Sequence, residues 1–475
     1  MNVVFRPGRV TQVVVAAALG AVLAAGAGSR TALDHYIEKP DPAYKYDVVG
    51  AVTCDNCTAH VIDMKSQTWL TEKEVDRPLW QHWVTVIRPL KATSSTGLLF
   101  ITGGGNGSKP PERADPVLSM VARETGAVVT ELRMVPNQTL KFASDPTGRA
   151  RTEDSLIAFA WDKFLRGADA EWLPRLPMTK SAVRAMDTVT SFCRTEQGGG
   201  LTVNKFVVSG GSKRGWTTWT TAAVDKRVAA IVPFVIDLLN VVPSFEHHWR
   251  VYGFWAPAVK DYQDMKIMDW NGTARYKEMM KIVEPYEYRD RLTMPKYIVN
   301  ASGDQFFIPD SSQFYFKDLK GEKYLRYVPN ADHSLRNSDA MQGLMGYLQS
   351  LLENKPRPRF SWKLEKDGGI RVMAKDAPKE VKLWQASNAK ARDFRLMTIG
   401  PAWKSTPVEG KGGIYVGKAE KPAEGWTAFF VELTYPGPGK FPLKFTTEVR
   451  VTPDVLPHAP YQPDRSHIPA SNGGK

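Results

Sequence analysis

Residues 205–215, KFVVSGGSKRG, predict a short buried strand that turns sharply into a helix. Such a turn raises the side chain at its apex, here Ser212, above the edge of a sheet, and small neighbours permit the strained backbone. Arg214 stands where the commoner Gly-x-Ser-x-Gly pattern has its second glycine. The start of an ordinary helix has a similar composition, so this segment alone does not identify Ser212 as a nucleophile. That prediction depends on catalytic partners elsewhere in the chain.

Two candidate partners each follow another short apolar segment that is typical of a strand. These are Asp304 and His333, and the order serine, acid, histidine is the order found in α/β-hydrolases. Each lies just past the carboxyl end of a strand, where open α/β sheets place their sites. His333 would accept the proton of Ser212, and Asp304 would orient the imidazole. The alternative acids are Asp237, which also follows a strand, and Asp310 and Asp332.

A glycine-rich loop, Gly103-Gly104-Gly105-Asn106-Gly107, follows a predicted strand at 98–102. In hydrolases of this kind the corresponding loop gives one backbone N–H to the oxyanion, and the residue after the nucleophile gives the other. We therefore expect Gly104, Gly105 and Lys213 to form the oxyanion hole. A phosphate-binding loop is disfavoured because the chain has no Gly-Lys-Ser/Thr ending and no dinucleotide fingerprint.

The remaining pattern predicts an α/β fold. The chain opens with extended segments, and from residue 97 to about 353 apolar strands alternate with helices. The expected strands are 44–53, 58–64, 82–90, 97–102, 127–134, 205–208, 228–236, 296–300 and 323–328, and the expected helices are 116–125, 153–166, 179–193, 212–225, 311–319 and 337–353. An irregular aromatic stretch, about 237–290, is interpreted as a cap inserted into the sheet.

The chain divides into a large catalytic unit and a smaller companion. We predict an α/β-hydrolase domain at 28–355 and, after Pro356-Arg357-Pro358, an Ig-like β-sandwich domain at 356–456 built from short strands between Gly, Pro and Lys clusters. The tail 457–475 is rich in Pro, Ser, Asn and Gly, so we expect it to be disordered.

The first 27 residues resemble a cleaved signal peptide. A positively charged start precedes a short apolar run and an Ala-x-Ala site at Ala25-Gly26-Ala27. An uncleaved anchor helix is the alternative, although the run is marginal in length for a bilayer. We therefore expect an exported protein, periplasmic or secreted. In that oxidising setting Cys54 and Cys57 are candidates for a local disulfide, and Cys193 is expected to be a buried thiol.

The net charge of +13 is compatible with an anionic partner such as a lipopolysaccharide-rich envelope surface. Lys and Arg are interspersed with Asp and Glu, and no nucleic-acid motif is present, so nucleic-acid binding is not expected. Adjacent side chains diverge on any regular element, so His247 and His248 do not have the spacing of metal ligands. We predict no metal site and no cofactor.

Aromatic and polar residues of the cap and the elbow are candidates for a substrate cleft. We expect Trp216, His248, Trp249 and Asn106 to contribute to it. Ordinary core packing is the alternative interpretation of the aromatic side chains.

Several segments together resemble the PhoPQ-activated pathogenicity-related protein family. They are WLT (69–71), RPLWQHW (77–83), PNQ (136–138), GGSKRGW (210–216), GDQFF (303–307) and PNADHS (329–334). The resemblance covers roughly residues 40–450 and implies an exported α/β-hydrolase-like protein with an accessory C-terminal β domain, similar to the autocrine proliferation repressor proteins. The elbow also resembles that of glucuronoyl esterases, which have arginine where this chain has Lys213.

Two functions remain open at this stage. The first is a serine hydrolase of esterase or peptidase type that acts on a small ester or peptide substrate through an acyl-enzyme. The second is a secreted binding or signalling protein that uses the same scaffold without turnover. The oligomeric state is not indicated by the sequence.

Overall fold

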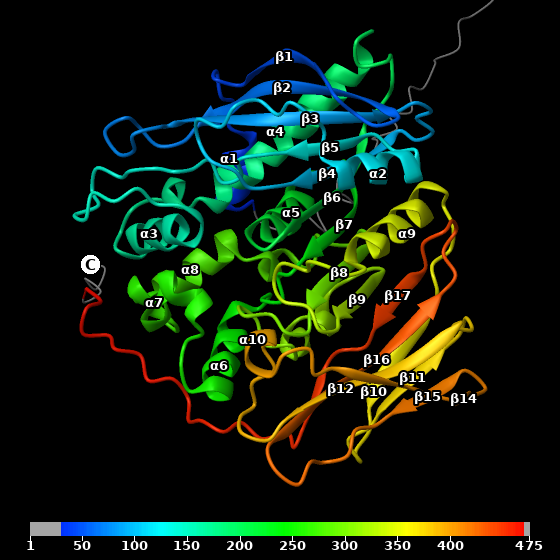
Figure 1. Ribbon diagram of the computed structural model, residues 1–475. Helices are drawn as coiled ribbons and strands as arrows, with labels where there is room; N and C mark the ends of the chain where they lie inside the picture. The colour runs from blue at the N-terminus through cyan, green and yellow to red at the C-terminus, as the bar shows by residue number, and fades with distance from the viewer. Residues whose placement is uncertain (1–29, 470–475) are drawn as a thin grey trace, which may run out of the picture.

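The computed structural model describes residues 30–469, so the predicted signal peptide at 1–27 lies outside the described residues (Figure 1). A long twisted sheet runs through the molecule, and its first nine strands lie in the order β1, β2, β3, β5, β4, β6, β7, β8, β9. They are β1 (Lys45–Val52), β2 (Cys57–Thr68), β3 (Leu79–Pro89), β4 (Thr96–Ile101), β5 (Val129–Leu132), β6 (Lys205–Gly211), β7 (Val228–Phe234), β8 (Lys296–Ala301) and β9 (Lys323–Val328).

The pairing of these strands is that of an α/β-hydrolase. β3 is antiparallel to both of its neighbours, whereas all neighbours from β5 to β9 are parallel. Counted from β2, the spatial order is first, second, fourth, third, then fifth to eighth, which is the strand order of that fold. β1 adds an antiparallel edge strand. The predicted fold class is confirmed.

Helices cover both faces of the sheet, which explains why the central strands are apolar throughout. Helices α1 (Ala32–Glu38), α4 (Arg175–Arg194) and α5 (Lys213–Val224) pack on one face, and α2 (Pro116–Thr125) and α9 (Ala340–Leu352) on the other (Figure 1). Successive strand residues serve opposite cores: Val208 belongs to the cluster under α4 and α5, and Val207 to the cluster under α2 and α9.

A helical cap lies between β7 and β8. It contains α6 (Val241–Tyr252), α7 (Lys260–Asp264) and α8 (Ala274–Val283), joined by 3-10 turns. Helix α3 (Glu153–Leu165), from an earlier part of the chain, packs against α7 and α8. The inserted cap expected from the aromatic stretch is therefore present, and α3 completes it.

The C-terminal β region continues the central sheet instead of standing apart from it. Strand β17 pairs with β9 through Thr446 and Leu325, and β16, β12 and β13 follow, with β18 on β16. A second sheet, β10-β11-β15-β14, packs face to face on this one. The two sheets are so close at Gly417 that a Cβ there would touch Val431 and Leu383. The strands are β10 (Phe360–Leu364), β11 (Ile370–Ala374), β12 (Glu380–Asn388), β13 (Lys404–Pro407), β14 (Gly410–Lys411), β15 (Ile414–Gly417), β16 (Trp426–Tyr435), β17 (Leu443–Thr446) and β18 (Arg450–Thr452), with the short helix α10 (Leu396–Ile399) between β12 and β13.

Two local expectations are wrong. Residues 311–319 form two short 3-10 turns, Ser311–Phe314 and Phe316–Asp318, and no α-helix. The described part of the tail, residues 457–469, is not disordered but crosses the cap along a defined path. Tyr461 donates to Asp269 at 2.6 Å, and Tyr461 and Ile468 pack on the core, so apolar anchors outweigh the polar composition.

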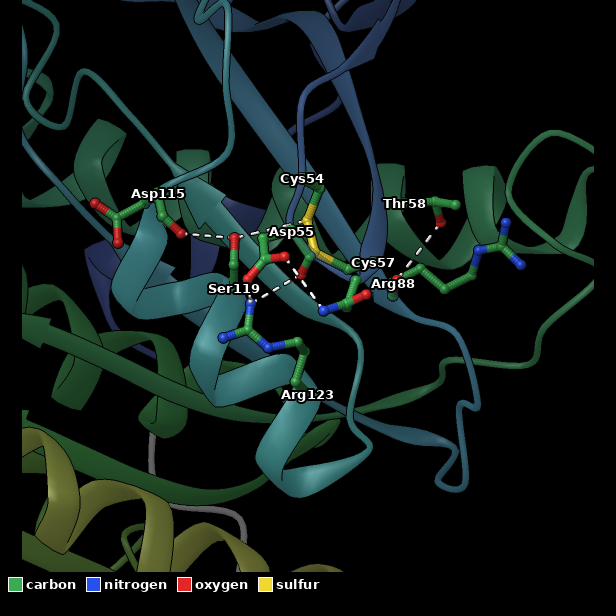
Figure 2. The surroundings of a disulfide bond; sticks show 9 residues. Cys54, Asp55, Cys57, Thr58, Arg88, Asp115, Ser119 and Arg123 are labelled. Carbon is green, nitrogen blue, oxygen red and sulfur yellow. Dashed lines mark hydrogen bonds and ion pairs between the residues drawn. A yellow bond between two sulfur atoms is a disulfide. The ribbon is translucent and has the colours of Figure 1, made fainter.

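Cys54 and Cys57 form a disulfide in the connection between β1 and β2 (Figure 2). Arg123 on α2 reaches the same turn and pairs with Asp55 at 3.2 Å. Cys193 is a buried free thiol, and burial raises its pKa to about 11. Among residues 30–469, no helix combines the length and the apolar character needed to cross a bilayer.

Candidate active site

Ser212 occupies a strained turn between β6 and α5. Its backbone has φ 58° and ψ −121°, a conformation that side-chain-bearing residues rarely adopt and that is typical of functional sites. The Ser212 N–H donates to the carbonyl of Phe234 at 2.9 Å. A Cβ on Gly210 would approach Arg214 to 2.8 Å, and one on Gly215 would approach the Phe234 carbonyl to 2.9 Å. The two glycines therefore allow the first turn of α5 to lie directly against the strands.

The arginine that replaces the usual glycine, Arg214, points away from the sheet. Its guanidinium forms a two-point ion pair with Glu153 at 2.9 and 2.5 Å, and its Nε donates to the carbonyl of Val135. This contact ties the elbow to the start of α3 and to the segment after β5. The departure from the common motif is thus accommodated by a side chain that braces the turn.

Asp304 and His333 face each other across two neighbouring loops. His333 Nδ1 and Asp304 Oδ2 are 2.8 Å apart, and Asp304 Oδ1 accepts the N–H of Phe306 at 2.7 Å. The backbone N–H of His333 donates to the side chain of Gln305 at 3.1 Å. Both the acid and the histidine are therefore fixed in orientation by groups of the acid loop.

The other ring nitrogen of His333, Nε2, is buried and makes no hydrogen bond with any described residue. The ring of Phe306 packs on the imidazole at 4.3 Å between centroids, and Phe307 lies at 5.8 Å. Phe306, Phe307 and Ser212 line one pocket. The three sequence-predicted residues thus follow the carboxyl ends of β6, β8 and β9, and no hydrogen bond joins Ser212 to His333 in this structure.

The alternative acid, Asp237, is held by other partners. Its two oxygens accept the hydroxyls of Tyr315 at 2.6 Å and Tyr327 at 2.7 Å. Burial raises its pKa to about 8, with the negative charges of Asp304 and Asp310 adding to the effect. Asp237 is therefore a buried carboxyl beneath the site, and the structure pairs His333 with Asp304.

The glycine loop lies beside the elbow. A Cβ on Gly103 would collide with the Arg214 guanidinium at 2.5 Å, and Gly104 adopts a φ of 133° against Met134. Asn106 and Gly105 turn toward the segment after β5, where the Asn106 amide donates to Thr139 at 3.1 Å. The Lys213 N–H lies in the first turn of α5, where no intrahelical acceptor exists. Lys213 lines the pocket at Ser212, whereas Gly104, Gly105 and Asn106 do not.

The pocket at Ser212 has a volume of about 50 Å³ and is mainly apolar. The cap contributes residues from α6 to α8, and α3, α4, α5 and the loops after β7 and β8 contribute the others. Its lining residues are Asp154, Trp161, Arg175, Ser212, Lys213, Trp216, Ile236, Leu238, Val241, Phe245, Val259, Tyr262, Ile267, Met268, Tyr276, Phe306 and Phe307.

Of the predicted cleft residues, Trp216 lines this pocket, whereas His248 and Trp249 do not. Placing His248 in the cleft was wrong because burial lowers its pKa to about 3 and its Nε2 accepts the N–H of Ala256 at 3.1 Å. Trp249 packs instead on Trp255 and on Tyr461 of the tail.

Arg175 and Asp154 also line the pocket, and neither was predicted from the sequence. Arg175 lies in an apolar stretch, WLPRLPM, where an isolated charge is the only signal that could have singled it out. Asp154 stands beside Glu153 at the start of α3, which is an ordinary position for an acidic residue.

The C-terminal β region touches both loops of the acid–histidine pair. The backbone N–H of Leu396 donates to the carbonyl of Gly303 at 2.9 Å, directly before Asp304. Asn330, on the histidine loop, exchanges two hydrogen bonds of 2.9 Å with the backbone of Trp403. Arg392 pairs with Asp310 at 2.7 Å. Residues 392–403 therefore form a docking segment against the acid loop, the histidine loop and the cap.

The strand order, the strained serine elbow and the aspartate–histidine pair define a protein of the α/β-hydrolase fold. The chain belongs to the PhoPQ-activated pathogenicity-related protein family, whose sequence profile matches residues 33–395. It is 37% identical over 459 residues to autocrine proliferation repressor protein A of Dictyostelium discoideum, covering 90% of this chain and 91% of that protein.

Solved structures with a similar arrangement include an acetyl xylan esterase from Thermoanaerobacterium, with 13% identity, a TM-score of 0.46 and coverage of 67% of this chain and 92% of that one. Another is a glucuronoyl esterase from Solibacter usitatus, with 11% identity, a TM-score of 0.37 and coverage of 66% and 86%.

Proposed function

We propose that this protein is an exported serine hydrolase that cleaves an ester or peptide bond of a small substrate through an acyl-enzyme on Ser212. The observation that carries the proposal is the His333–Asp304 hydrogen bond, with the His333 ring packed on Phe306 and Phe307, which line the same pocket as Ser212. A serine hydroxyl becomes a nucleophile at neutral pH only when a base takes its proton.

The proposed reaction gives these residues the usual roles of a serine, histidine and aspartate triad. His333 Nε2 takes the proton of the Ser212 hydroxyl as Oγ attacks the substrate carbonyl, and Asp304 stabilises the resulting imidazolium. The N–H of Lys213 and an N–H of the loop at Gly104 and Gly105 would stabilise the oxyanion. The leaving group departs with the proton from His333, and water, activated by the same histidine, releases the acyl group.

Export is supported by two observations. The segment 1–27 has the pattern of a signal peptide, and Cys54 and Cys57 form a disulfide, which is common in oxidising compartments and rare in the cytosol. We expect the protein to be recovered from the periplasm or the medium. Its mature chain should begin near residue 28, and Cys54 and Cys57 should be disulfide-bonded.

A second function, secreted signalling without turnover, is favoured by the name of the Dictyostelium relative, a proliferation repressor. Fold alone does not decide between the two. A Ser212→Ala protein that keeps its full biological effect would support signalling and count against hydrolysis as the basis of that effect.

The first experiment is labelling of the purified protein with a fluorophosphonate, which reports an activated serine without knowledge of the substrate. We expect labelling that is lost in Ser212→Ala and in His333→Ala. Ser209→Ala and His60→Ala are the matched controls, because these residues lie in strands away from the pocket, and they should keep labelling. Equal labelling of Ser212→Ala, or no labelling of the folded wild-type protein, would refute the proposal.

A further inference from the structure

The pocket at Ser212 contains a buried cation that has no carboxylate partner. Arg175, the first residue of α4, is 3% exposed and lines the pocket. Its NH1 group donates to the backbone carbonyl of Lys213 at 3.0 Å, which places the guanidinium one residue along the chain from the nucleophile. Its Nε–H has no hydrogen-bond partner among the described residues.

The two carboxylates nearby are committed to other cations. Glu153 forms the two-point pair with Arg214 and also lies 3.2 Å from the ammonium of Lys213. Asp154 accepts that same ammonium at 2.7 Å. Two carboxylates therefore face three cations, and Arg175 forms no ion pair with any residue in the described range 30–469.

The groups in direct contact with Arg175 are neutral, and the charge of Asp154 attracts it from beyond the Tyr262 hydroxyl. Its guanidinium stacks on the ring of Trp216, 4.4 Å from the centroid, and interacts with the hydroxyl of Tyr262. That hydroxyl donates to Asp154 at 3.0 Å and so stays uncharged. Burial lowers the pKa of Arg175 and outweighs the attraction of Asp154, yet an arginine remains charged at neutral pH.

A fixed, desolvated guanidinium is a strong receptor for a carboxylate, because its parallel N–H groups match the two oxygens. Most of the remaining wall is apolar, with side chains such as Ile236, Val241, Phe245 and Met268. We propose that Arg175 is an anion-binding subsite and that the substrate is an ester or amide with an apolar chain bearing a carboxylate, separate from the bond that Ser212 attacks. The substrate class rests on the proposed hydrolase function, whereas the subsite itself can be tested without turnover.

The binding test uses Ser212→Ala protein and two small probes of the same size, pentanoate and pentanamide. Trp161 and Trp216 line the pocket, so tryptophan fluorescence reports binding. We expect pentanoate to bind about tenfold more tightly than pentanamide, and Arg175→Met to bring the ratio close to one with little change for pentanamide. The subsite would be refuted if Ser212→Ala protein bound pentanoate and pentanamide equally well. It would also be refuted if the preference for pentanoate remained after Arg175→Met.

Arg184→Met is the matched control for the loss of an arginine. Arg184 is on the same helix and also stacks on an aromatic ring, that of Tyr44 at 4.7 Å, but it lies outside the pocket. It should leave the ratio unchanged. If Arg175→Met does not fold, Arg175→Lys keeps the charge without the planar fork. It should lower the preference for pentanoate, and an unchanged preference would count against the proposal.

Turnover separates this inference from the proposed function. The monoester of 4-nitrophenol with glutarate and the ester with pentanoate have acyl chains of equal length and differ in a terminal carboxylate. Wild-type protein should favour the glutarate ester in kcat/KM, and Arg175→Met should remove that preference. Selective pentanoate binding without fluorophosphonate labelling refutes hydrolysis alone, whereas labelling without any preference for the anion refutes the subsite alone.

Discussion

Replacing Arg392 with methionine should destabilise the protein strongly, because this residue neutralises a carboxylate inside the interface of the C-terminal β region. The Arg392 and Asp310 side chains are 1% and 4% exposed and pair at 2.7 Å. The second oxygen of Asp310 lies 2.9 Å from His247 Nε2 on α6. Without the arginine, a buried carboxylate keeps only the histidine as a partner.

The size of the effect follows from this burial. Removal of one partner from a buried ion pair costs about 3–5 kcal/mol of unfolding free energy at neutral pH. Burial by itself raises the pKa of Asp310, but the attraction of Arg392 and His247 outweighs it and holds the pKa below the ordinary value. The wild-type pair therefore stabilises the protein above the unfolded pKa near 4. In the variant only the attraction of His247 is left against burial, which raises that pKa above its wild-type value, so the loss should be largest at pH 7 to 8 and shrink toward pH 5.

Urea unfolding followed by tryptophan fluorescence measures this loss, with the slope of the transition checked for two-state behaviour. The control is Lys440→Met. Lys440 also joins the C-terminal region to the rest of the protein, through Glu124 at 2.6 Å, but it is 60% exposed. That change should cost less than about 1 kcal/mol. A loss below about 1 kcal/mol for Arg392→Met, or a loss that grows as the pH falls, would refute the reasoning.

Three further predictions concern the site and its surroundings. Ser212→Gly should abolish fluorophosphonate labelling yet raise the unfolding free energy by about 1 kcal/mol, because glycine tolerates the strained backbone; an unchanged urea midpoint would argue against strain at the elbow. Burial raises the pKa of Asp237 to about 8 from 3.8, so its stabilisation is complete below pH 4 and is lost as the pH rises through 8. The stability of wild-type protein relative to Asp237→Asn should accordingly fall between pH 4 and 8, and a constant difference in unfolding free energy would contradict this. Reduction of the Cys54–Cys57 disulfide, which closes a very short loop, should cost at most about 2 kcal/mol in urea unfolding; global unfolding on reduction would disprove a merely local role.

The parts of the fold that the sequence predicted are those set by local pattern. An apolar run followed by small and polar residues indicates a strand and its carboxyl end, so the strands before Ser212, Asp304 and His333 were found from the sequence alone. Because parallel strands end at one edge of the sheet, their loops meet there whatever their separation along the chain. The class of fold follows from the same pattern.

The errors arose where a non-local polar contact decides the structure. The segment 311–319 has the composition of a helix, but Tyr315 is held by Asp237 and Asp310 by Arg392, and the backbone forms 3-10 turns between these anchors. His248 has the chemistry of a site residue and is instead a core acceptor. No periodicity reports such contacts, because each partner lies far away in sequence.

The pocket charge balance could not be predicted for the same reason. Arg175 meets the backbone of Lys213, which is 38 residues away, and Lys213 meets Asp154, which is 59 residues away. Those contacts exist only because the starts of α3, α4 and α5 converge beneath the cap. The sequence shows a net charge of +13 spread over the chain, but it does not show that one cation without an ion-pair partner among the described residues lies beside Ser212.

The C-terminal β region contacts both loops of the Asp304–His333 pair. Its docking segment, residues 392–403, bonds to the loop of Asp304 through Gly303 and to the loop of His333 through Asn330. The hydrogen bond between Asp304 and Nδ1 of His333 joins these two loops. Among the described residues, no other hydrogen bond reaches that nitrogen. A small displacement of either loop would lengthen that bond, and catalysis by a triad is sensitive to such displacements. Asn330→Ala should therefore slow the labelling of Ser212 strongly while it lowers the unfolding free energy only slightly. If the β region serves only to stabilise the fold, the labelling rate should fall no more than the loss of folded protein explains.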